Sequence, residues 1–300
     1  MKKSAKRKIY HSLPTEAIHP KSLELDARPS REVIALLLAE ETRAVKTISS
    51  LIPALTRAVD RIVAALQDGG RLIYVGAGTS GRLGALDAAE LPPTFGSSRS
   101  QVVAVLAGGA RAMLRSVEGA EDRPRDAERK LDRLRVSDKD VVCAIAASGV
   151  TRFSRAALEV AKARGAQTIF VTCAKQVGDV ADVVIAASVG PEVLAGSTRL
   201  KAGTATKIIL NALSTATMMR LGKVYRGRMV DVVASNHKLR ARALRIVMEL
   251  CKLDERAATN LLKQARGSAK LAISMHTLGV DAAEALTRLA AVDGNLRRLR

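Results

Sequence analysis

The sequence has few aromatic residues: 2% of 300, comprising three Tyr, three Phe and no Trp. Proteins that bind single-stranded nucleic acid stack the bases on aromatic side chains, and this chain offers few such platforms. The net charge of +20 comes from cations scattered along the chain, apart from a basic start and the segment Arg297–Arg300. We therefore interpret the charge as a solvated surface that attracts small anions, and predict no nucleic-acid partner.

Cysteine and histidine are also scarce, with three and four residues. Neither type recurs at the spacing of a metal site, so we predict no metal, and the absence of paired cysteines suits a reducing compartment. No apolar run reaches the roughly 20 residues that cross a bilayer. The basic start lacks the apolar stretch of a secretory signal. We therefore expect a cytoplasmic protein without a membrane partner.

Short apolar runs alternate with helical patterns, which is typical of an α/β protein whose parallel sheet is covered on both faces. The predicted strands are Leu72–Val75, Val102–Leu106, Val141–Ala146, Thr168–Thr172 and Val183–Ala187. The predicted helices are Arg31–Lys46, Pro53–Leu66, Thr198–Leu221 and a series from Ser235 onward with breaks near Leu253, Gly267 and Gly279. We divide the chain into a basic segment at 1–30, an α/β domain at 31–249 and a small helical bundle at 250–300.

The segment Arg71–Gly84 contains the strongest functional signal. Its strand Leu72–Val75 ends in a glycine-rich turn, and a helical pattern follows. A helix that starts after such a turn directs N–H groups and partial positive charge at an anion. Gly78 in the turn, together with the hydroxyls of Thr79 and Ser80, is therefore predicted to bind the phosphate of a small molecule.

Two nucleotide-binding alternatives each lack a required residue. Gly76–Gly81 fits the pattern G-x-G-x-x-G, but the next strand ends in Ala107-Gly108-Gly109 without the acid that would hold a ribose. Arg82 and Leu83 stand where a triphosphate loop needs Lys and Ser or Thr. A monophosphate needs only the loop and its hydroxyls. A turn that serves packing alone stays open as an alternative.

Two further loops place small hydroxyl residues at helix starts: the loop after the third predicted strand and the segment Gly190–Thr204. The candidate ligands that they add are Ser148, Gly149, Thr151, Ser197 and Lys201. The carboxyl ends of neighbouring parallel strands meet at one edge of a sheet, so two of these loops are expected to grip one phosphate. A serine in a turn also serves as a local cap, and that interpretation stays open.

Carboxylates follow the first two βα units. Glu90 comes just before Leu91-Pro92-Pro93, which we expect to end the first loop's helix, and Glu118, Glu121 and Asp122 form a cluster further on. By itself each carboxylate is typical of a solvated surface. Their places around the predicted phosphate loop favour a role in acid–base chemistry.

Several long motifs together resemble those of the N-acetylmuramic acid 6-phosphate etherases. They are Tyr74–Gly84, Asp87–Gly96, Val117–Asp122, Gly190–Thr204 and Leu221–Tyr225, with Met229-Val-Asp231 and Asn236 after them. The resemblance extends from about Thr15 to the C-terminus. It implies a sugar-isomerase (SIS) fold: a doubly wound, five-stranded parallel sheet flanked by helices, with a small helical C-terminal domain. It also implies a homodimer with shared active sites and no metal.

The resemblance implies that Glu90 and Glu121 are the catalytic pair, with Glu118 as a neighbouring candidate that the alignment passes over. The family cleaves the D-lactyl ether of a phosphorylated cell-wall sugar by elimination and hydration, which yields N-acetylglucosamine 6-phosphate and D-lactate. Two positioned carboxylates are sufficient for such proton transfers, so no cofactor is expected. The implied role is the recycling of cell-wall amino sugar.

Three positions depart from the family pattern. Val150 stands where the family usually has Arg, Ala174-Lys175 replaces Asn-Pro, and Ile18-His19 replaces Arg-Asn. A lost arginine weakens or redirects substrate binding. Three rival functions stay open: a non-catalytic sugar-phosphate sensor, an aldose–ketose isomerase of the same fold, and a transcription regulator. The last would need an N-terminal helix-turn-helix, whereas residues 31–68 predict two longer helices.

Overall fold

The computed structural model describes residues 13–175, 177–234 and 236–299. The chain forms two compact units. The first contains the residues up to 88 and residues 102–213, and the second contains residues 89–101 and those from 214 onward. The proposed division at residues 30 and 249 stays a prediction.

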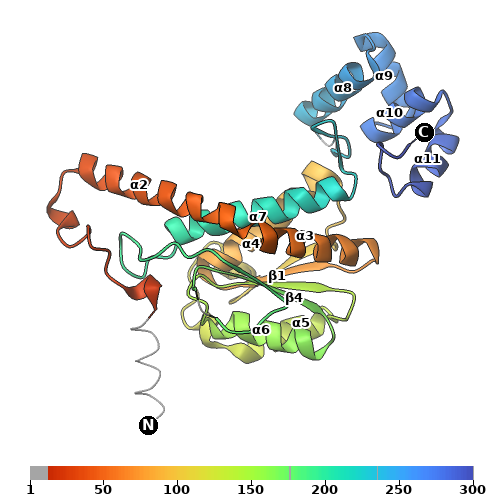
Figure 1. The fold of residues 1–300 in the computed structure, drawn as a ribbon. Helices are drawn as coiled ribbons and strands as arrows, with labels where there is room; N and C mark the ends of the chain where they lie inside the picture. The colour runs from red at the N-terminus through yellow and green to blue at the C-terminus, as the bar shows by residue number, and fades with distance from the viewer. Residues whose placement is uncertain (1–12, 176, 235, 300) are drawn as a thin grey trace. The chain divides into compact units, whose positions relative to one another are not determined.

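A five-stranded sheet forms the centre of the first unit (Figure 1). Its strands are β1 (Leu72–Gly76), β2 (Val102–Leu106), β3 (Val141–Ile145), β4 (Gln167–Thr172) and β5 (Val183–Ala186). Their order is β2-β1-β3-β4-β5, and every neighbouring pair is parallel. The predicted fold class is confirmed, and all five predicted strands form within one residue of the expected bounds.

The strand order determines where a ligand crevice forms. The chain runs from β1 to β2 on one side of β1 and then crosses to β3 on the other side, so the direction of winding changes between β1 and β3. In open α/β sheets ligands bind at such a switch point, beyond the carboxyl ends of the strands. Gly76 pairs with Leu106 and with Ile145. The loops that follow β1, β2 and β3 therefore start at the same edge.

Helices cover both faces of the sheet (Figure 1). They are α3 (Ile52–Gln67), α4 (Gly78–Phe95), α5 (Pro124–Arg133), α6 (Arg152–Ala163) and α7 (Lys201–Arg220). The helix α2 (Ser30–Ile48) precedes them and extends away from the sheet in Figure 1. Ile73 and Val75 of β1 pack with Leu131 of α5 and Phe153 of α6. Tyr74 points to the opposite face, where its hydroxyl donates to Asp87 of α4 at 3.0 Å. Successive side chains of β1 thus point to opposite faces of the sheet, and each face packs against its own layer of helices.

The end of α4 differs from the expectation. We predicted that Leu91-Pro92-Pro93 would end the helix after Glu90, but α4 continues to Phe95 with both prolines inside it. The ring of proline fixes φ near the helical value, so both prolines can adopt helical backbone, although neither has an N–H for an intrahelical hydrogen bond. Gly96 then ends the helix with φ +62° and donates to the carbonyl of Pro92.

The second unit contains the C-terminal helices and a small hairpin. The hairpin strands are β6 (Val224–Tyr225) and β7 (Arg228–Met229), and the helices are α8 (His237–Cys251), α9 (Glu255–Gln264), α10 (Ala269–Leu278) and α11 (Ala282–Ala291). Side chains of Asn236, Asp254, Ser268 and Asp281 cap the four helices. Val247, Ala272 and Ala285 lie in a common apolar core. The hairpin was not predicted, since two-residue strands leave no periodicity to read.

Over the described residues, no helix combines the length and apolar character needed to cross a bilayer. In the same part of the chain, no group of three or more His, Cys, Asp or Glu residues has a metal-site arrangement. Cys143, Cys173 and Cys251 are buried free thiols. Burial raises the pKa of Cys173 to about 12 and that of Cys251 to about 11, so both stay protonated at neutral pH.

Candidate functional site

A cavity of about 240 Å³ opens where the loops after β1 and β3 meet. The residues that line it are Leu13, Glu16, Ala77, Gly78, Thr79, Ser80, Glu121, Asp122, Ala147, Ser148, Val150, Thr151, Gly196 and Thr198. The structure therefore brings together predicted ligands from two separate loops, with the predicted carboxylate Glu121 beside them. Its lining is predominantly polar, as expected for a site that holds a charged small molecule.

The first loop is tight because its glycines approach backbone closely. A side chain on Gly81 would collide with Leu106 and with the carbonyl of Gly76, and Gly78 has φ +55°. A Cβ at Gly84 would come within 2.9 Å of Tyr74 Cβ, so that glycine lets α4 pack against β1. The glycine pattern thus serves packing, and it also places the first turn of α4 on the cavity. The first N–H groups of a helix have no intrahelical acceptor and are available to a ligand.

The loop after β3 is held by its own contacts. Gly149 has φ +75° and donates to the carbonyl of Ala146 at 3.0 Å. Arg155 Nε donates to the carbonyl of Gly149 at 2.7 Å, and this positioning residue was not identified from the sequence. Ser148 Oγ accepts a long hydrogen bond of 3.4 Å from the N–H of Val150. The hydroxyl therefore caps the turn weakly and retains its own proton for a ligand.

The segment before α7 supplies the third wall. Gly196 and Thr198 line the cavity, and Ser197 lies between them without being part of the lining. Lys201, predicted as an anion ligand, lies outside the lining. Its side chain is 2% exposed and its Nζ lies 2.6 Å from Glu40 Oε2.

Glu121 is the predicted catalytic residue that the structure places in the cavity wall. It also borders an adjoining cavity of about 150 Å³, which Glu118 and Arg82 line as well. Burial raises the pKa of Glu121, and the neighbouring charges of Asp122 and Glu118 raise it further. A carboxyl group with a raised pKa is suited to donate a proton near neutral pH. Arg82 donates instead to the carbonyls of Ala112 and Met113, so it fixes a loop.

Glu90 is not part of the cavity lining. It is exposed on α4, ten residues after Ser80 on the same helix. Within the described part of one chain, the two predicted carboxylates are therefore not both in this cavity. Glu16 does line it, although nothing in the sequence pattern singled it out. It lies in an irregular N-terminal segment that has no periodicity from which its position could be predicted.

The cavity lining contains no Lys or Arg among the residues that the structure describes. Val150, expected from the family resemblance to be a departure from Arg, contributes an apolar side chain to the wall. An anion in this cavity would depend on backbone N–H groups and hydroxyls. Such neutral donors form weaker hydrogen bonds than a guanidinium does.

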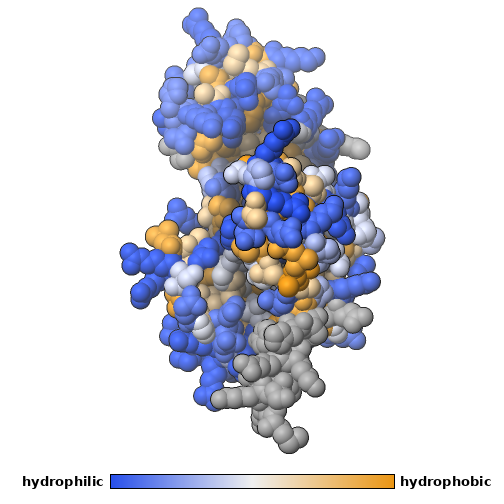
Figure 2. Space-filling view, turned by 90° about the vertical axis from the view of Figure 1, so that its left-hand side faces the viewer, coloured by the Kyte–Doolittle hydropathy of each residue, from blue (hydrophilic) through white to orange (hydrophobic). Residues whose placement is uncertain are grey.

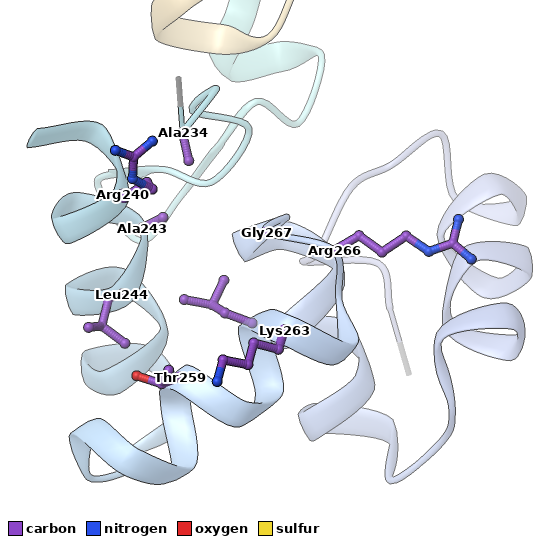
Figure 3. A pocket seen from close by; sticks show the side chains of 9 residues that line it. Ala234, Arg240, Ala243, Leu244, Thr259, Lys263, Arg266 and Gly267 are labelled. Atoms are coloured by element: carbon purple, nitrogen blue, oxygen red, sulfur yellow. The ribbon is translucent and has the colours of Figure 1, made fainter. Parts of the chain in front are cut away.

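A larger cavity of about 390 Å³ lies between α8 and α9 in the second unit (Figure 3). It is lined by Ala234, Arg240, Ala243, Leu244, Thr259, Leu262, Lys263, Arg266 and Gly267. Its wall is largely aliphatic, and in the close-up the Arg266 side chain extends away from it (Figure 3). Its lining residues include no carboxylate, so acid–base chemistry favours the smaller cavity of the first unit.

Two family patterns match the α/β part of the chain. The N-terminal SIS domain of glucokinase regulatory protein matches residues 54–162, and the SIS domain matches residues 122–216. A solved structure of a phosphoheptose isomerase from Francisella tularensis is similar with a TM-score of 0.50. It is 18% identical in sequence, and the match covers 64% of this chain and 100% of that one. This likeness supports the fold alone.

Curated relatives are similar over nearly the full length. N-acetylmuramic acid 6-phosphate etherase 2 of Vibrio cholerae is 46% identical, over 95% of this chain and 94% of the relative. N-acetylmuramic acid 6-phosphate etherase of Gloeothece citriformis is 48% identical, with 95% and 94% covered. Identity at this level over both units extends well beyond the phosphate loop.

Proposed function

The chain belongs to the family of N-acetylmuramic acid 6-phosphate etherases, and from that premise we propose how its residues carry out the reaction. The enzyme cleaves the D-lactyl ether of N-acetylmuramic acid 6-phosphate, which gives N-acetylglucosamine 6-phosphate and D-lactate. The observation that carries the proposal is the cavity at the β1/β3 switch point, where hydroxyl-bearing loops and Glu121 meet.

The 6-phosphate binds between the loops after β1 and β3. Gly78, Thr79 and Ser80 supply backbone N–H groups and hydroxyls from the first turn of α4. Ser148 and Thr151 supply hydroxyls from the other side, with Gly149 shaping their turn. Ser197, predicted as a ligand, lies outside the lining, and we assign it no contact with the phosphate. The partial positive charge of the helix N-terminus favours the dianion.

The ether bond breaks by elimination. Opening of the sugar ring leaves an aldehyde at C1, which makes the C2 proton acidic. A base removes that proton while an acid protonates the lactate oxygen that leaves C3, and a C2–C3 double bond forms. Water then adds at C3 and a proton returns to C2. The net change is one water consumed and one ether bond replaced by two hydroxyl groups.

Glu121 acts as the acid and Glu90 as the base. The raised pKa of Glu121, due first to burial and then to Asp122 and Glu118, favours its protonated form. Glu90 is exposed on α4, and the family resemblance assigns it as the other carboxylate of the pair. The two residues differ in environment, which is how a pair of carboxylates divides acid and base roles.

The enzyme works as a homodimer whose protomers complete each other's sites. On α2, Ile34 and Leu38 are 54% and 63% exposed, and Val45 is 42% exposed two turns further on. Seen from the side on which α2 projects in Figure 1, the surface carries apolar patches between charged side chains (Figure 2). An exposed apolar helix face of this kind marks a protein interface.

The reaction takes place in the cytoplasm, as part of the recycling of cell-wall amino sugar. The three thiols are buried and free, as in proteins of a reducing compartment. The field of the net charge of +20 draws in an anionic sugar phosphate.

Isotope labelling tests the reaction. The purified protein is incubated with N-acetylmuramic acid 6-phosphate in ¹⁸O-water, and both products are examined by mass spectrometry. Elimination and hydration put the heavy oxygen at C3 of the sugar, and in D₂O put deuterium at C2. Label in the lactate hydroxyl would contradict the assigned roles of Glu90 and Glu121, and absence of lactate would contradict the function itself.

A further inference from the structure

Glu16 is a carboxylate in the cavity that no step of the proposed reaction uses. It ends the short 3₁₀ helix η1 (Pro14–Glu16), and its side chain is exposed to the cavity. With Glu121 and Asp122 it gives a phosphate-sized cavity three acidic residues. Carboxylates repel a phosphate, so Glu16 needs a different partner on the substrate.

The backbone around Glu16 is anchored to the loop before α7. The N–H of Gly196 donates to the carbonyl of Thr15 at 2.9 Å, and Thr15 is 2% exposed. Gly196 has φ +76°, and a Cβ at that position would lie 3.0 Å from Glu16 Oε2. Glycine at 196 therefore leaves room for the carboxylate of Glu16 against the third wall of the cavity.

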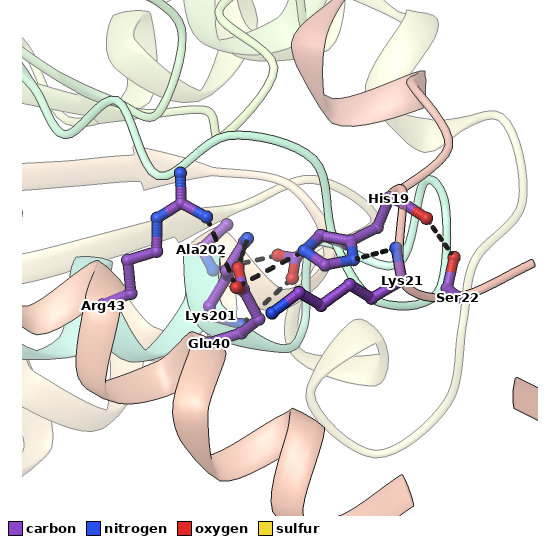
Figure 4. Close-up of polar contacts among 8 residues, drawn as sticks. His19, Lys21, Ser22, Glu40, Arg43, Lys201 and Ala202 are labelled. Atoms are coloured by element: carbon purple, nitrogen blue, oxygen red, sulfur yellow. Dashed lines mark hydrogen bonds and ion pairs between the residues drawn. The ribbon is translucent and has the colours of Figure 1, made fainter. Parts of the chain in front are cut away.

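A buried polar network holds the same segment from its other end (Figure 4). His19 is 4% exposed, and its Nδ1 accepts from the N–H of Lys21 at 3.2 Å. The other ring nitrogen, Nε2, lies 3.4 Å from Glu40 Oε1. Glu40 in turn holds Lys201 of α7 at 2.6 Å.

The network makes the N-terminal segment a fixed part of the site. Glu192 Oε1 accepts from the N–H of Ala202 at 3.0 Å, and Glu192 Oε2 accepts from the N–H of Lys201 at 3.3 Å. One carboxylate thus caps the start of α7 while another, Glu40, pairs with the Lys201 ammonium. Residues 13–20, α2 and α7 are joined through these groups, and Glu16 is held at the cavity from both sides.

We propose that Glu16 recognises the sugar, by accepting a hydrogen bond from a hydroxyl or from the acetamido N–H of the substrate. Ionised carboxylates only accept, and sugar hydroxyls and amide N–H groups are the donors that a phosphosugar offers. His19 acts as a positioning residue for Glu16. This inference rests on the proposed function, since it takes an amino-sugar phosphate as the ligand.

Two ligands separate sugar recognition from phosphate binding. Calorimetric titration with N-acetylglucosamine 6-phosphate and with inorganic phosphate compares the wild type with Glu16→Ala and Glu16→Gln. In Glu16→Ala the affinity for the sugar phosphate should fall about tenfold, as for a lost hydrogen bond to a charged group. The affinity for inorganic phosphate should rise, because a negative charge has been removed. Glu24→Gln, an exposed carboxylate of the same segment outside the cavity lining, is the matched control and should change neither.

Variants of His19 test the positioning role. His19→Leu should raise the KM for the substrate and leave kcat within about twofold, whereas His19→Gln keeps an N–H donor and should restore the KM. Glu16→Ala affinities that move in the same direction for both ligands, or an unchanged sugar-phosphate affinity, would overturn the role of Glu16. If the titrations give either of these results while the wild type releases lactate, only the role of Glu16 is overturned. If the wild type releases no lactate, the proposed reaction is overturned.

Discussion

At the scale of single residues, the cavity offers neutral hydrogen-bond donors to an anion. Thr79, Ser80, Ser148 and Thr151 line it, and Val150 adds an apolar side chain. Backbone N–H groups at the start of α4 add the partial charge of a helix end. Each of these contacts is modest, so individual hydroxyls and the identity of residue 150 should have measurable effects on affinity.

Ser80→Ala and Ser148→Ala should each weaken binding of N-acetylglucosamine 6-phosphate by about 1.5–3 kcal/mol, the value of a hydrogen bond to a charged group. Neither change should alter the urea midpoint much, because both side chains are only half-buried, Ser80 in the first turn of α4 and Ser148 in the loop after β3. Isothermal calorimetry measures the affinities. Unchanged affinity in both variants would remove the phosphate from these loops.

Val150→Arg should tighten binding of inorganic phosphate about tenfold, because a guanidinium forms charge-assisted hydrogen bonds with phosphate oxygens. Val150→Leu changes the size of the side chain without adding charge and serves as the control. Titration at two salt concentrations gives a further check, since the gain should shrink as ionic strength rises. Equal affinities for the two variants would mean that residue 150 does not face the anion.

Glu121→Gln should lower the rate of lactate release by about 10²–10⁴-fold, the usual contribution of a general acid or base. The pKa of Glu121 is raised, so in the wild type the protonated acid is lost, and the rate falls, as pH rises through that value. Glu118→Gln is the matched control and should keep most of the rate. If Glu118→Gln is the damaging change instead, the second carboxylate of the reaction has been assigned wrongly.

At the scale of secondary-structure elements, the start of α7 shows how buried charge shapes the site. Lys201 was predicted to bind the anion, but its side chain is buried against Glu40 and cannot reach the cavity lining. Burial alone would raise the pKa of Glu40, but the hydrogen bond and charge of Lys201, with His19 and Arg43, lower it overall. The folded state therefore holds Glu40 in its charged form.

Lys201→Met should destabilise the protein by about 3–5 kcal/mol, because it leaves a buried carboxylate without its main partner. The double change Glu40→Leu with Lys201→Met removes both charges and should recover most of that loss. Wild-type stability should decline as pH falls below the ordinary Glu40 pKa of 4.5, and the double variant should lack this dependence. Urea unfolding measures both. A double variant as unstable as Lys201→Met would contradict the pairing.

At the scale of the whole molecule, α2 exposes apolar side chains that no other part of the described chain covers. Of its 19 residues, only Glu40, Ala44 and Ile48 are buried, while Ile34 and Leu38 are well exposed. A long helix with so little burial gains little stability from packing within the chain. A second copy packed on this face would supply the missing burial.

Light scattering should report about twice the 31.8 kDa of one chain at micromolar concentration. Changing both Ile34 and Leu38 to Glu should shift the protein to the monomer and lower activity, since the sites are proposed to be shared. Leu114→Glu alters a side chain that is 93% exposed but lies outside α2, and it should leave the dimer intact. A wild-type monomer, or a dimer that survives the double change, would contradict this interface.

The fold class and the position of the glycine-rich loop after β1 were predictable from the amino-acid sequence. A buried strand such as Val141–Ile145 is visible in the sequence as a continuous apolar run. Gly76 and Gly81 are visible because their backbones approach too closely for any side chain, which requires glycine at both positions. Family motifs supplied the reaction and the candidate pair Glu90 and Glu121.

The set of side chains that line one cavity could be read from the folded chain but not from local sequence patterns. In the fold, Glu16 and Gly196 line the same cavity, and Lys201 pairs with Glu40, 161 positions away in the sequence. Arg155 donates a hydrogen bond to the carbonyl of Gly149. Side chains such as Lys and Glu are flexible and are usually solvated, so nothing local predicts whether they are buried. Which partners these Lys and Glu side chains meet depends on which loops lie together at one edge of the sheet. The strand order determines this, and it exists only in the folded chain.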